Sequence, residues 1–581
     1  MQQPSVAAAS HLSPSYPERA AWGTADRLRA WQAAALQDYL ARSPKDFLAT
    51  ATPGAGKTTF ALRVATELIQ AGVVRRVSVV APTEHLKTQW ADAAARVGIR
   101  IDPNFRNAQG RHSVEFDGVA LTYAQVAANP ALHSARTKAA PTLVILDEVH
   151  HGGDALSWGD AVREAFTSAT RRLSLTGTPF RSDTAAIPFI DYVPDGEGIR
   201  RSQADFSYGY GDALRDGVVR PVLFHAYTGD MRWRTKAGDE MSASLGQPMT
   251  KDQIAQAWRT ALDPQGEWIG SVLAAADTRL TQMRRTVTDA GGLVIATDQD
   301  SARAYAQRLR TISGEEPVLV LSDDPGSSRR IEEFGAGLQR WMVAVRMVSE
   351  GVDVPRLAVG VYATAAATPL FFAQAIGRFV RARKRGETAS IFLPSVPVLL
   401  GLAGELEAER DHALDRTSSD DGDGLLDDAE LERANRAEPA AGMLDGFQAL
   451  EANASFDRVL FDGGEFGVGA DMGSDEELDF LGLPGLLDAD QVATLLRQRQ
   501  AEHVARAPAK SAPPLDHRRL AELRKELNAL VSAWSRRSGT PHGVLHTRLR
   551  QHSGGGEVAT ASAAQIESRI AQVRRWFIGK S

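Results

Sequence analysis

Cysteine is absent from the 581 residues of the chain. Without a thiol, the protein has no disulfide, no nucleophilic cysteine and no cysteine-ligated zinc or iron–sulfur cluster. No run of about 18 uncharged apolar residues occurs, so we expect no transmembrane helix. The first residues lack the basic start and apolar core of a secretion signal, and residues 1–25 are expected to be a disordered leader. These absences favour a cytoplasmic location.

The charge is unevenly distributed along the chain. Residues 401–490 hold 25 acidic and 5 basic side chains, whereas residues 491–581 hold 16 basic and 6 acidic ones. The acidic stretch is rich in glycine and aspartate, so we expect a helical or disordered acidic insert over 401–506. Residues 515–581 are expected to form a small basic domain, with helices over 520–537 and 561–577. A basic domain favours a polyanionic partner, and both segments are candidate surfaces for protein partners, although a solvated helical surface has the same composition.

Two stretches of the chain alternate short apolar strand patterns with amphipathic helical ones. Apolar strands separated by helices predict parallel sheets with helices on both faces. The sequence therefore predicts an α/β fold with two tandem lobes, 26–194 and 289–400, joined by a more helical connector or insertion over 195–288. The strand patterns lie at 75–83, 119–123, 142–150 and 171–179, and at 291–297, 317–323, 340–345, 357–364 and 389–394.

A glycine-rich segment, ATPGAGKTT at 51–59, separates a short strand pattern (47–49) from a helical run. This is the context of a phosphate-binding loop, although a chance glycine-rich turn is the alternative for the segment alone. Its glycines let backbone N–H groups curl around phosphates, and the helix N-terminus adds partial positive charge. Lys57 is expected to reach the β- and γ-phosphates of ATP, and Thr58 to bind Mg²⁺. The predicted ATP-binding residues of the loop are Pro53, Gly54, Ala55, Gly56, Lys57, Thr58 and Thr59.

A second motif, LVILDEVHH at 143–151, places two carboxylates at the end of an apolar strand. Ligands of open parallel sheets bind at that end of the strands. Asp147 is expected to hold Mg²⁺ through its water shell, and Glu148 to orient and deprotonate the attacking water. A surface acidic turn is the alternative, which the phosphate loop upstream disfavours.

With these two motifs, the chain resembles superfamily 2 helicases of the DExH group over about residues 26–395. The resemblance implies two RecA-like lobes that share one ATP and move along nucleic acid. LRAWQ at 28–32 resembles the adenine-reading element, which implies that Gln32 pairs with adenine. The segments 79–90 and 121–126 resemble motifs Ia and Ib, although ordinary strand-end turns are the alternative. The residues that they imply near the nucleic-acid backbone are Pro82, Thr83, Lys87 and Thr122.

Three further motifs follow in the order of that family. LSLTGTPFR at 173–181 resembles motif III, whose Thr176 and Thr178 link the ATP site to the second lobe. VSEGVDVP at 348–355 resembles motif V, which implies that Gly351 and Asp353 face nucleotide and nucleic acid.

The last motif is QAIGRFVRAR at 374–383, which resembles motif VI. Gln374, Arg378 and Arg381 are spaced i, i+4 and i+7, so the pattern predicts one shared helical face. Gln374 is expected in the catalytic set, and Arg378 and Arg381 are candidate arginine fingers, which stabilise the charge on the transferring γ-phosphate. A basic solvated helix is the alternative for this segment alone.

The motif details favour DNA as the substrate. The motif III segment reads TGTP, where DEAD-box RNA helicases have SAT, and residues 206–224 resemble the equivalent stretch of type III restriction helicase subunits. We therefore expect an ATP- and Mg²⁺-dependent DNA helicase or translocase of bacterial or phage origin, with contacts largely independent of base sequence. A motor subunit of a restriction or defence nuclease complex, and an RNA helicase, remain open as alternatives.

Overall fold

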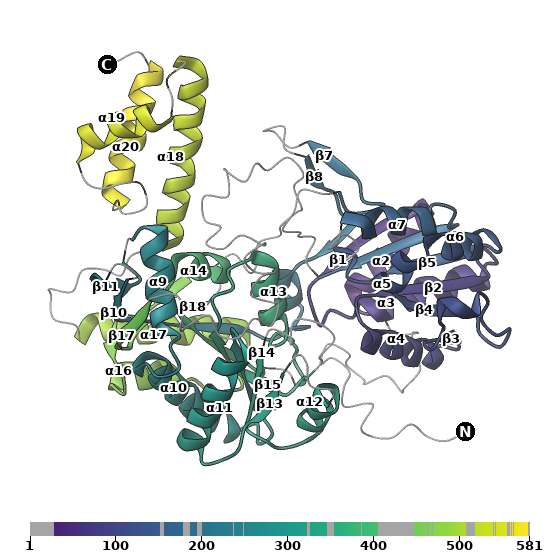
Figure 1. Ribbon diagram of the computed structural model, residues 1–581, viewed down its shortest axis with the longest axis horizontal. Helices are drawn as coiled ribbons and strands as arrows, with labels where there is room; N and C mark the ends of the chain where they lie inside the picture. The colour runs from purple at the N-terminus through teal and green to yellow at the C-terminus, as the bar shows by residue number, and fades with distance from the viewer. Residues whose placement is uncertain are drawn as a thin grey trace.

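The chain forms two α/β lobes and a separate group of C-terminal helices, as the computed structural model shows (Figure 1). None of the helices it describes is both long and apolar enough to cross a membrane. It describes residues 28–578 apart from 151–155, 178–185, 195–199, 236–237, 248, 322–325, 346–353, 385, 405–446, 462–463, 468, 507–516, 539, 541, 555–557, 559–560 and 562.

The first lobe is built on a seven-stranded parallel sheet in the order β3-β4-β2-β5-β6-β1-β9. The predicted α/β fold is thereby confirmed for the first lobe, although β9 lies beyond the predicted end of this lobe at residue 194. Its strands are β1 (Asp46–Ala51), β2 (Arg76–Ala81), β3 (Ile101–Asp102), β4 (Gly118–Thr122), β5 (Thr142–Leu146), β6 (Arg171–Thr176) and β9 (Phe206–Tyr208). Its helices are α2 (Ala30–Arg42), α3 (Lys57–Gln70), α4 (Glu84–Arg96), α5 (Tyr123–Ala128), α6 (Pro130–Lys138) and α7 (Leu156–Phe166), with the 3-10 turn η1 (Asn107–Gln109).

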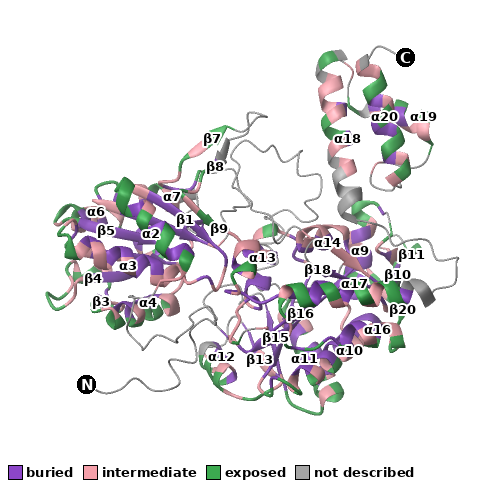
Figure 2. Cartoon of the chain, turned by 180° about the vertical axis from the view of Figure 1, so that it is seen from behind, coloured by how far each residue is buried: buried purple, intermediate pink, exposed green. Residues whose placement is uncertain are grey.

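Both faces of this sheet are buried, which explains why its strands are apolar throughout (Figure 2). On β5, Leu143 and Ile145 belong to the core that contains Phe60 of α3, which we call the α3-side core. Val144 and Leu146 belong to the core on the other face, which contains Phe166 of α7 and which we call the α7-side core. Side chains that alternate between faces therefore fill two separate cores, as expected for a parallel sheet covered by helices.

The second lobe holds an eleven-stranded sheet in the order β13-β14-β12-β15-β16-β10-β18-β19, with β11 and β17 on β10 and β20 on β18. A two-stranded ribbon, β7 (Tyr192–Pro194) with β8 (Arg200–Ser202), and helix α8 (Tyr210–Arg215) precede it. Its strands are β10 (Val222–Arg234), β11 (Glu240–Leu245), β12 (Gly291–Ala296), β13 (Val318–Val320), β14 (Trp341–Val345), β15 (Leu357–Ala363), β16 (Ala389–Pro394), β17 (Gln448–Ala452), β18 (Ser455–Phe461), β19 (Gly464–Phe466) and β20 (Ala470–Asp471). Its helices are α9 (Lys251–Ala261), α10 (Glu267–Arg284), α11 (Gln299–Ser313), α12 (Ser327–Ala336), α13 (Pro369–Gly377), α14 (Pro397–Gly404), α16 (Asp475–Leu481) and α17 (Ala489–Arg506).

Two sequence-based boundaries are wrong. The predicted connector over 195–288 contributes β10, a strand of 13 residues that pairs in parallel with β16 and antiparallel with β18. The predicted acidic insert over 401–506 contributes β17 to β20, α16 and α17 to the same lobe, while 405–446 lie outside the described residues. On β18 the apolar side chains of Phe456, Val459 and Leu460 are buried while Asp457 is less so. The acidic composition therefore masked a strand pattern.

Residues 477–483, within the predicted acidic insert, are held against the second lobe by buried hydrogen bonds. The guanidinium of Arg279 on α10 is fully buried and donates to the carbonyl oxygens of Leu481 (3.0 Å) and Leu483. The hydroxyl of Tyr227 on β10 donates to Oε1 of Glu477 at 2.7 Å. Leaving a buried donor or acceptor without a partner costs free energy of folding. These bonds therefore fix residues 477–483 against the sheet.

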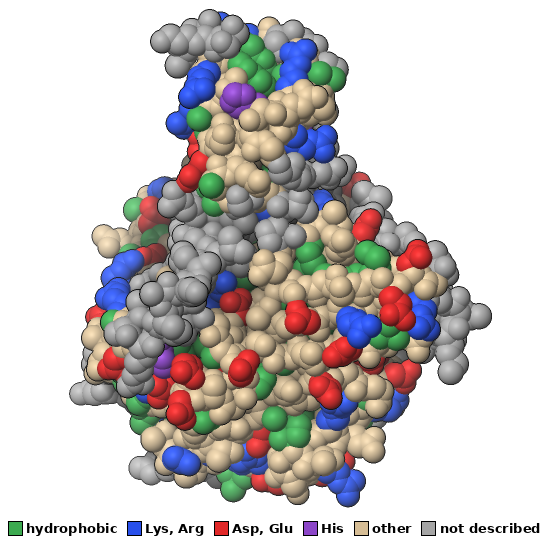
Figure 3. Space-filling model, turned by 90° about the vertical axis from the view of Figure 1, so that its left-hand side faces the viewer, with side chains coloured by type: hydrophobic (Ala, Val, Ile, Leu, Met, Phe, Trp, Pro, Cys, Tyr) green, Lys and Arg blue, Asp and Glu red, His purple; other side chains and the backbone are tan. Residues whose placement is uncertain are grey.

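The C-terminal helices enclose their own core. The helices α18 (His517–Ser538), α19 (His542–Ser553) and α20 (Ala563–Ile578) pack around Leu527, Leu545, Ile566 and their neighbours. The sequence predicted the first and last of these helices and missed α19. The ring centroids of Trp534 and Trp576 lie 6.1 Å apart. Basic side chains lie on the surface of these helices, at the top of Figure 3.

We predict that Arg279→Met lowers the melting temperature, because the carbonyl oxygens of Leu481 and Leu483 lose their buried donor. Each orphaned group costs about 1–3 kcal/mol. Calorimetry should report the loss, and hydrogen exchange should locate it at α16 and α17. Arg303→Met is the control, because Arg303 on α11 is 52% exposed; an equal loss in both variants would contradict the prediction.

Candidate active site at the junction of the two lobes

The candidate site residues of the first lobe lie at one edge of its sheet. The phosphate loop follows β1, and the segments resembling motifs Ia, Ib, DExH and III follow β2, β4, β5 and β6. Because these strands are parallel, their carboxyl ends meet at the same edge. The sheet order therefore assembles motifs that are more than 100 residues apart in the sequence.

The phosphate loop has the backbone shape that its glycines allow. Gly54 and Gly56 have φ angles of 82° and 91°, which glycine adopts without strain. The loop is bound by the start of α2, where the LRAWQ segment lies. The donors are Arg29 Nη1 to the carbonyls of Gly54 (3.0 Å) and Ala55 (2.5 Å), Trp31 Nε1 to Ala55 (3.1 Å) and Gln32 Nε2 to Gly56 (2.9 Å).

These bonds give the LRAWQ segment a role that the sequence did not reveal. The Gln32 amide contacts protein at both ends, because its Oε1 also accepts from the backbone N–H of Arg29 at 2.9 Å. Pairing of Gln32 with adenine stays a prediction. Arg29 and Trp31 were not singled out from the sequence, and their place beside Gln32 was the only available signal. Trp31 is further fixed by stacking on Tyr208 of β9, with ring centroids 5.2 Å apart.

Asp147 is a buried carboxylate at the end of β5, 8% exposed. Burial raises its pKa to about 6 and the neighbouring Glu148 adds to this, whereas the hydrogen bond from Trp90 opposes it. The indole Nε1 of Trp90 donates to Oδ2 at 2.7 Å. A nearby divalent cation favours the ionised form of such a group, so this environment suits the Mg²⁺ role predicted for Asp147 and Thr58.

Glu148 connects the phosphate loop to the segment after β6. Its Oε1 lies 3.3 Å from Nζ of Lys57, and its Oε2 accepts from the backbone N–H of Gly177 at 3.1 Å. A Cβ on Gly177 would lie 3.0 Å from Nζ of Lys57, so a side chain at this position would crowd the lysine. Glu148 itself has a φ of 44°, a left-handed backbone that costs energy in a non-glycine residue and often occurs at functional sites.

The surroundings of the loop also suit a triphosphate. Arg29 and Arg381 both lie on the loop. Burial lowers the pKa of Arg381 to about 10, and the positive charge of Arg29 contributes to this shift. Together with Lys57 they place three cationic groups around a loop whose glycines allow close approach of phosphates. Residues Pro53 to Thr59 would hold the nucleotide, and bound Mg²⁺ would neutralise charge that develops on the phosphates.

A histidine joins the two lobes. His150 follows Val149 after β5, and its Nδ1 lies 3.0 Å from Oγ1 of Thr176 on β6. Its Nε2 lies 3.5 Å from Nε2 of Gln374 on α13, in the second lobe. His150 thus connects the segments resembling motifs III and VI.

The second lobe also contacts the phosphate loop directly. A Cβ added to Gly54 would lie 3.0 Å from Cγ of Arg381, and one added to Gly377 would lie 2.8 Å from Cγ of Pro53. The predicted shared helical face is nevertheless wrong. Helix α13 ends at Gly377 and Arg378 is its C-cap, so Arg381 lies beyond the helix.

The helix ends there because the following residues pair with another segment. Arg381 forms an isolated β-bridge with Val219, and Nε of Arg220 donates to the carbonyl oxygen of Phe379 at 2.5 Å. The chain therefore leaves the helix in an extended course, and this course carries Arg381 onto Gly54.

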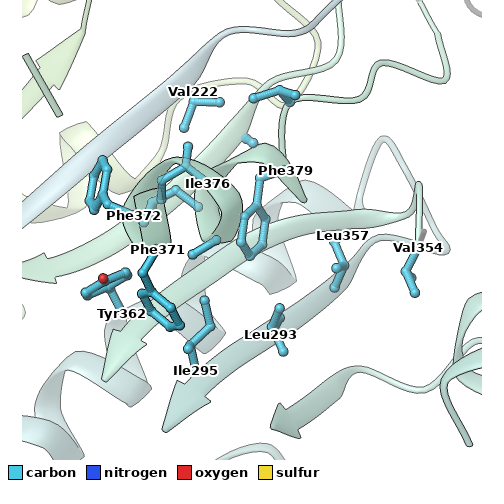
Figure 4. Close-up of a cluster of buried hydrophobic side chains, with 14 of the residues drawn as sticks. Val222, Leu293, Ile295, Val354, Leu357, Tyr362, Phe371, Phe372, Ile376 and Phe379 are labelled. Atoms are coloured by element: carbon cyan, nitrogen blue, oxygen red, sulfur yellow. The ribbon is translucent and has the colours of Figure 1, made fainter. Parts of the chain in front are cut away.

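The apolar face of α13 fixes the helix on the second sheet (Figure 4). Phe371, Phe372 and Ile376 are buried together with strand residues that include Leu293 and Ile295 (Figure 4). A Cβ on Gly360 of β15 would lie 2.6 Å from the ring of Phe379. This close packing sets the height of α13 above the sheet and, with it, the position of Gln374.

The residues predicted near nucleic acid lie at the starts of two helices. Thr83 and Thr122 cap α4 and α5, where their Oγ1 atoms accept from the N–H groups of Leu86 (3.4 Å) and Gln125 (3.1 Å). Lys87 is buried beside Glu84, 2.9 Å away. Contacts of Pro82, Thr83, Lys87 and Thr122 with nucleic acid stay predictions, and Thr178, Gly351 and Asp353 lie outside the described residues.

The sequence of the chain is similar to those of known proteins. Residues 26–181 match the family model of the type III restriction enzyme, res subunit. The uncharacterized protein MT2985 of Mycobacterium tuberculosis is 57% identical over 559 residues, which cover 94% of this chain and 92% of the relative. The uncharacterized protein ML1624 of Mycobacterium leprae is 54% identical over 559 residues, covering 94% of each.

Solved structures with some likeness include a fragment of an HsdR subunit of a type I restriction enzyme from Vibrio vulnificus (TM-score 0.43, 17% identity, 63% of this chain and 64% of that one). Dbp5 of S. cerevisiae bound to RNA has a TM-score of 0.40 and 13% identity, over 66% of this chain and 88% of that one. The assignment rests on the sequence relatives and the family match. The chain belongs to the family of the mycobacterial proteins MT2985 and ML1624, and its first lobe is similar to the res subunit of type III restriction enzymes.

Proposed function

We propose that the protein is an ATP-dependent DNA helicase or translocase, in which Mg²⁺-ATP binds between the two lobes. The match of residues 26–181 to the res subunit of type III restriction enzymes supports an enzyme that hydrolyses nucleoside triphosphate. The observation that carries the proposal is the contact between Arg381 of the second lobe and Gly54 of the phosphate loop. A triphosphate at the loop meets cationic groups of both lobes at once, so it stabilises their contact.

In the proposed mechanism each residue of the site has one task. Lys57 and the loop amides hold the β- and γ-phosphates, and Asp147 with Thr58 holds Mg²⁺, which supplies electrostatic stabilisation when bound. Glu148 orients a water and accepts its proton. Arg381, or Arg378 at the end of α13, neutralises charge on the γ-phosphate. Loss of that phosphate weakens the contact between the lobes, and a strand held by both lobes is passed along.

DNA is proposed as the substrate on two grounds. Residues 26–181 match a restriction-enzyme subunit model, and residues 176–179 read TGTP where DEAD-box RNA helicases have SAT. The starts of α4 and α5 are proposed to bind backbone phosphates, because the N-terminus of a helix attracts anions. Backbone contacts imply weak base preference and strong salt dependence.

The same family match favours a second candidate, the motor subunit of a restriction or defence nuclease complex. Affinity purification of the tagged chain from its native host distinguishes the two. A stoichiometric nuclease or methyltransferase partner favours the complex.

We predict that DNA stimulates the ATPase activity and that Glu148→Gln lowers kcat about 10²- to 10⁴-fold, because the general base is lost. Steady-state ATPase assays with single-stranded DNA, duplex, fork and RNA in parallel measure both effects. Glu316→Gln is the control, because Glu316 is 70% exposed in the second lobe. Stimulation by RNA alone would overturn the DNA assignment, and absence of ATP hydrolysis with every polynucleotide would overturn the proposed function.

We also predict that Gly377→Ala lowers kcat between about 10- and 100-fold, because small misplacements of reacting groups have effects of that size. The added methyl would lie 2.8 Å from Cγ of Pro53 and would force the lobes apart. Helix α13 itself tolerates alanine well, so the fold should persist. A fluorescent ATP analogue should still bind to the phosphate loop, but with lower affinity, because the contacts that the second lobe makes with the nucleotide are weakened.

Gly401→Ala is the matched control for this variant. Gly401 is also helical, on α14, and an added Cβ has no neighbour within 4 Å. Equal activities of the two variants would show that close contact of Gly377 with Pro53 is not needed for hydrolysis.

A further inference from the structure

The carboxylate of Asp147 is held by the helix that begins at the proposed nucleic-acid surface. Thr83, Lys87 and Trp90 are spaced i, i+4 and i+7 at the start of α4, so they share one face of the helix. The Trp90 indole is 2% exposed and donates to Oδ2 of Asp147 at 2.7 Å. A single helix therefore connects a proposed phosphate contact with the proposed metal carboxylate.

A second helix reaches the same residue from the other face of the sheet. Tyr123 directly follows Thr122, the N-cap of α5, and its hydroxyl donates to the backbone carbonyl of Asp147 at 2.9 Å. Tyr123 is fully buried in the α7-side core, whereas Trp90 lies in the α3-side core. Asp147 is thus held between two aromatic side chains that come from opposite faces.

The two carboxylates of the site have different attachments. The backbone N–H of Asp147 donates to the carbonyl of Val80 on β2 at 2.8 Å, which adds a third bond from the side of the sheet that leads to α4 and α5. Glu148, by contrast, is held by Lys57 and by the N–H of Gly177 after β6. The polynucleotide side of the sheet therefore holds Asp147, and the phosphate-loop side holds Glu148.

The two aromatic contacts are also linked to each other. Lys87 Nζ on α4 lies 3.4 Å from Oε1 of Gln125 on α5, so a displacement at the start of one helix acts on the other. Buried hydrogen bonds to a carboxylate are short and directional. A small displacement of either helix must therefore move Asp147 or break its bonds.

We propose that Trp90 and Tyr123 are positioning residues through which a polynucleotide bound at the starts of α4 and α5 sets the position of the Asp147 carboxylate for ATP hydrolysis. This inference rests on the proposed function. Neither residue contacts nucleotide in this scheme, and both act through Asp147.

The test compares Trp90→Phe and Tyr123→Phe with the unchanged protein. Each variant keeps an aromatic ring and loses one donor. The measurements are kcat and KM for ATP, with and without saturating single-stranded oligodeoxynucleotide, and the affinity for that oligonucleotide by fluorescence anisotropy. We expect the ratio of stimulated to basal kcat to fall about tenfold in Trp90→Phe, the factor associated with a lost hydrogen bond to a charged group, and less in Tyr123→Phe. KM and oligonucleotide affinity should stay unchanged.

Trp341→Phe is the matched control. Trp341 is 1% exposed on β14 in the second lobe, and its indole donates to Oδ1 of Asp277 at 2.8 Å, so the same kind of bond is removed far from Asp147. Its stimulation ratio should equal that of the unchanged protein. Melting temperatures of all variants show whether each one is folded.

The outcomes separate the inference from the proposed function. If the unchanged protein hydrolyses ATP without any stimulation, the proposed function fails before the variants are compared. If it is stimulated and Trp90→Phe keeps its full ratio, or loses basal and stimulated kcat equally, the positioning role is overturned. An equal fall of the ratio in Trp341→Phe would also overturn it, because a general loss of stability would then explain the effect.

Discussion

The order of strands in the first sheet, β4-β2-β5-β6-β1, governs the rest of the site. A parallel sheet presents the carboxyl ends of its strands at one edge, and β5 lies at the middle of this edge. Asp147 and Glu148 are adjacent in the chain, but they bond to different strands. The backbone N–H of Asp147 donates to Val80 of β2, whereas the carboxylate of Glu148 accepts from Gly177 after β6. Through two consecutive residues, the central strand thus joins the side of the sheet that carries the proposed nucleic-acid contacts to the side that carries the phosphate loop.

The second lobe completes the site through the segment at and beyond the end of α13. Its contacts with the phosphate loop rely on residues without side chains at Gly377 and Gly54, where a Cβ would meet Pro53 and Arg381. The packing of Phe379 on Gly360 and the bridge between Arg381 and Val219 hold this segment in place. The close approach of the lobes therefore depends on backbone geometry as much as on charge.

Much of the first lobe could be predicted from the sequence, because apolar strands and glycine-rich loops have local patterns. The strands that precede Lys57 and Asp147, and the strand that ends at Thr176, were all identified. The end of α13 could not be predicted, since Val219, a partner 162 positions upstream of Arg381, terminates the helix. The strands β17 to β20 were missed because they are short and lie in a stretch of the chain whose overall composition is acidic. The roles of Arg29, Trp31 and Trp90 depend on tertiary contacts that no local pattern records.

The order in which strands pair in the second sheet has a consequence for folding during synthesis. Strand β10 precedes most of its lobe in the chain, yet its two flanking partners are β16 and β18, so that Phe224 pairs with both Ile391 and Leu460. On the ribosome, the first lobe can close as soon as β9 has emerged. The Val222–Tyr227 part of β10, which does not pair with β11, waits with both edges unpaired until β16 and then β18 are translated. Domains generally fold in order of synthesis, and unpaired strand edges promote aggregation. The interval between these events is therefore the period in which the nascent chain most needs a chaperone.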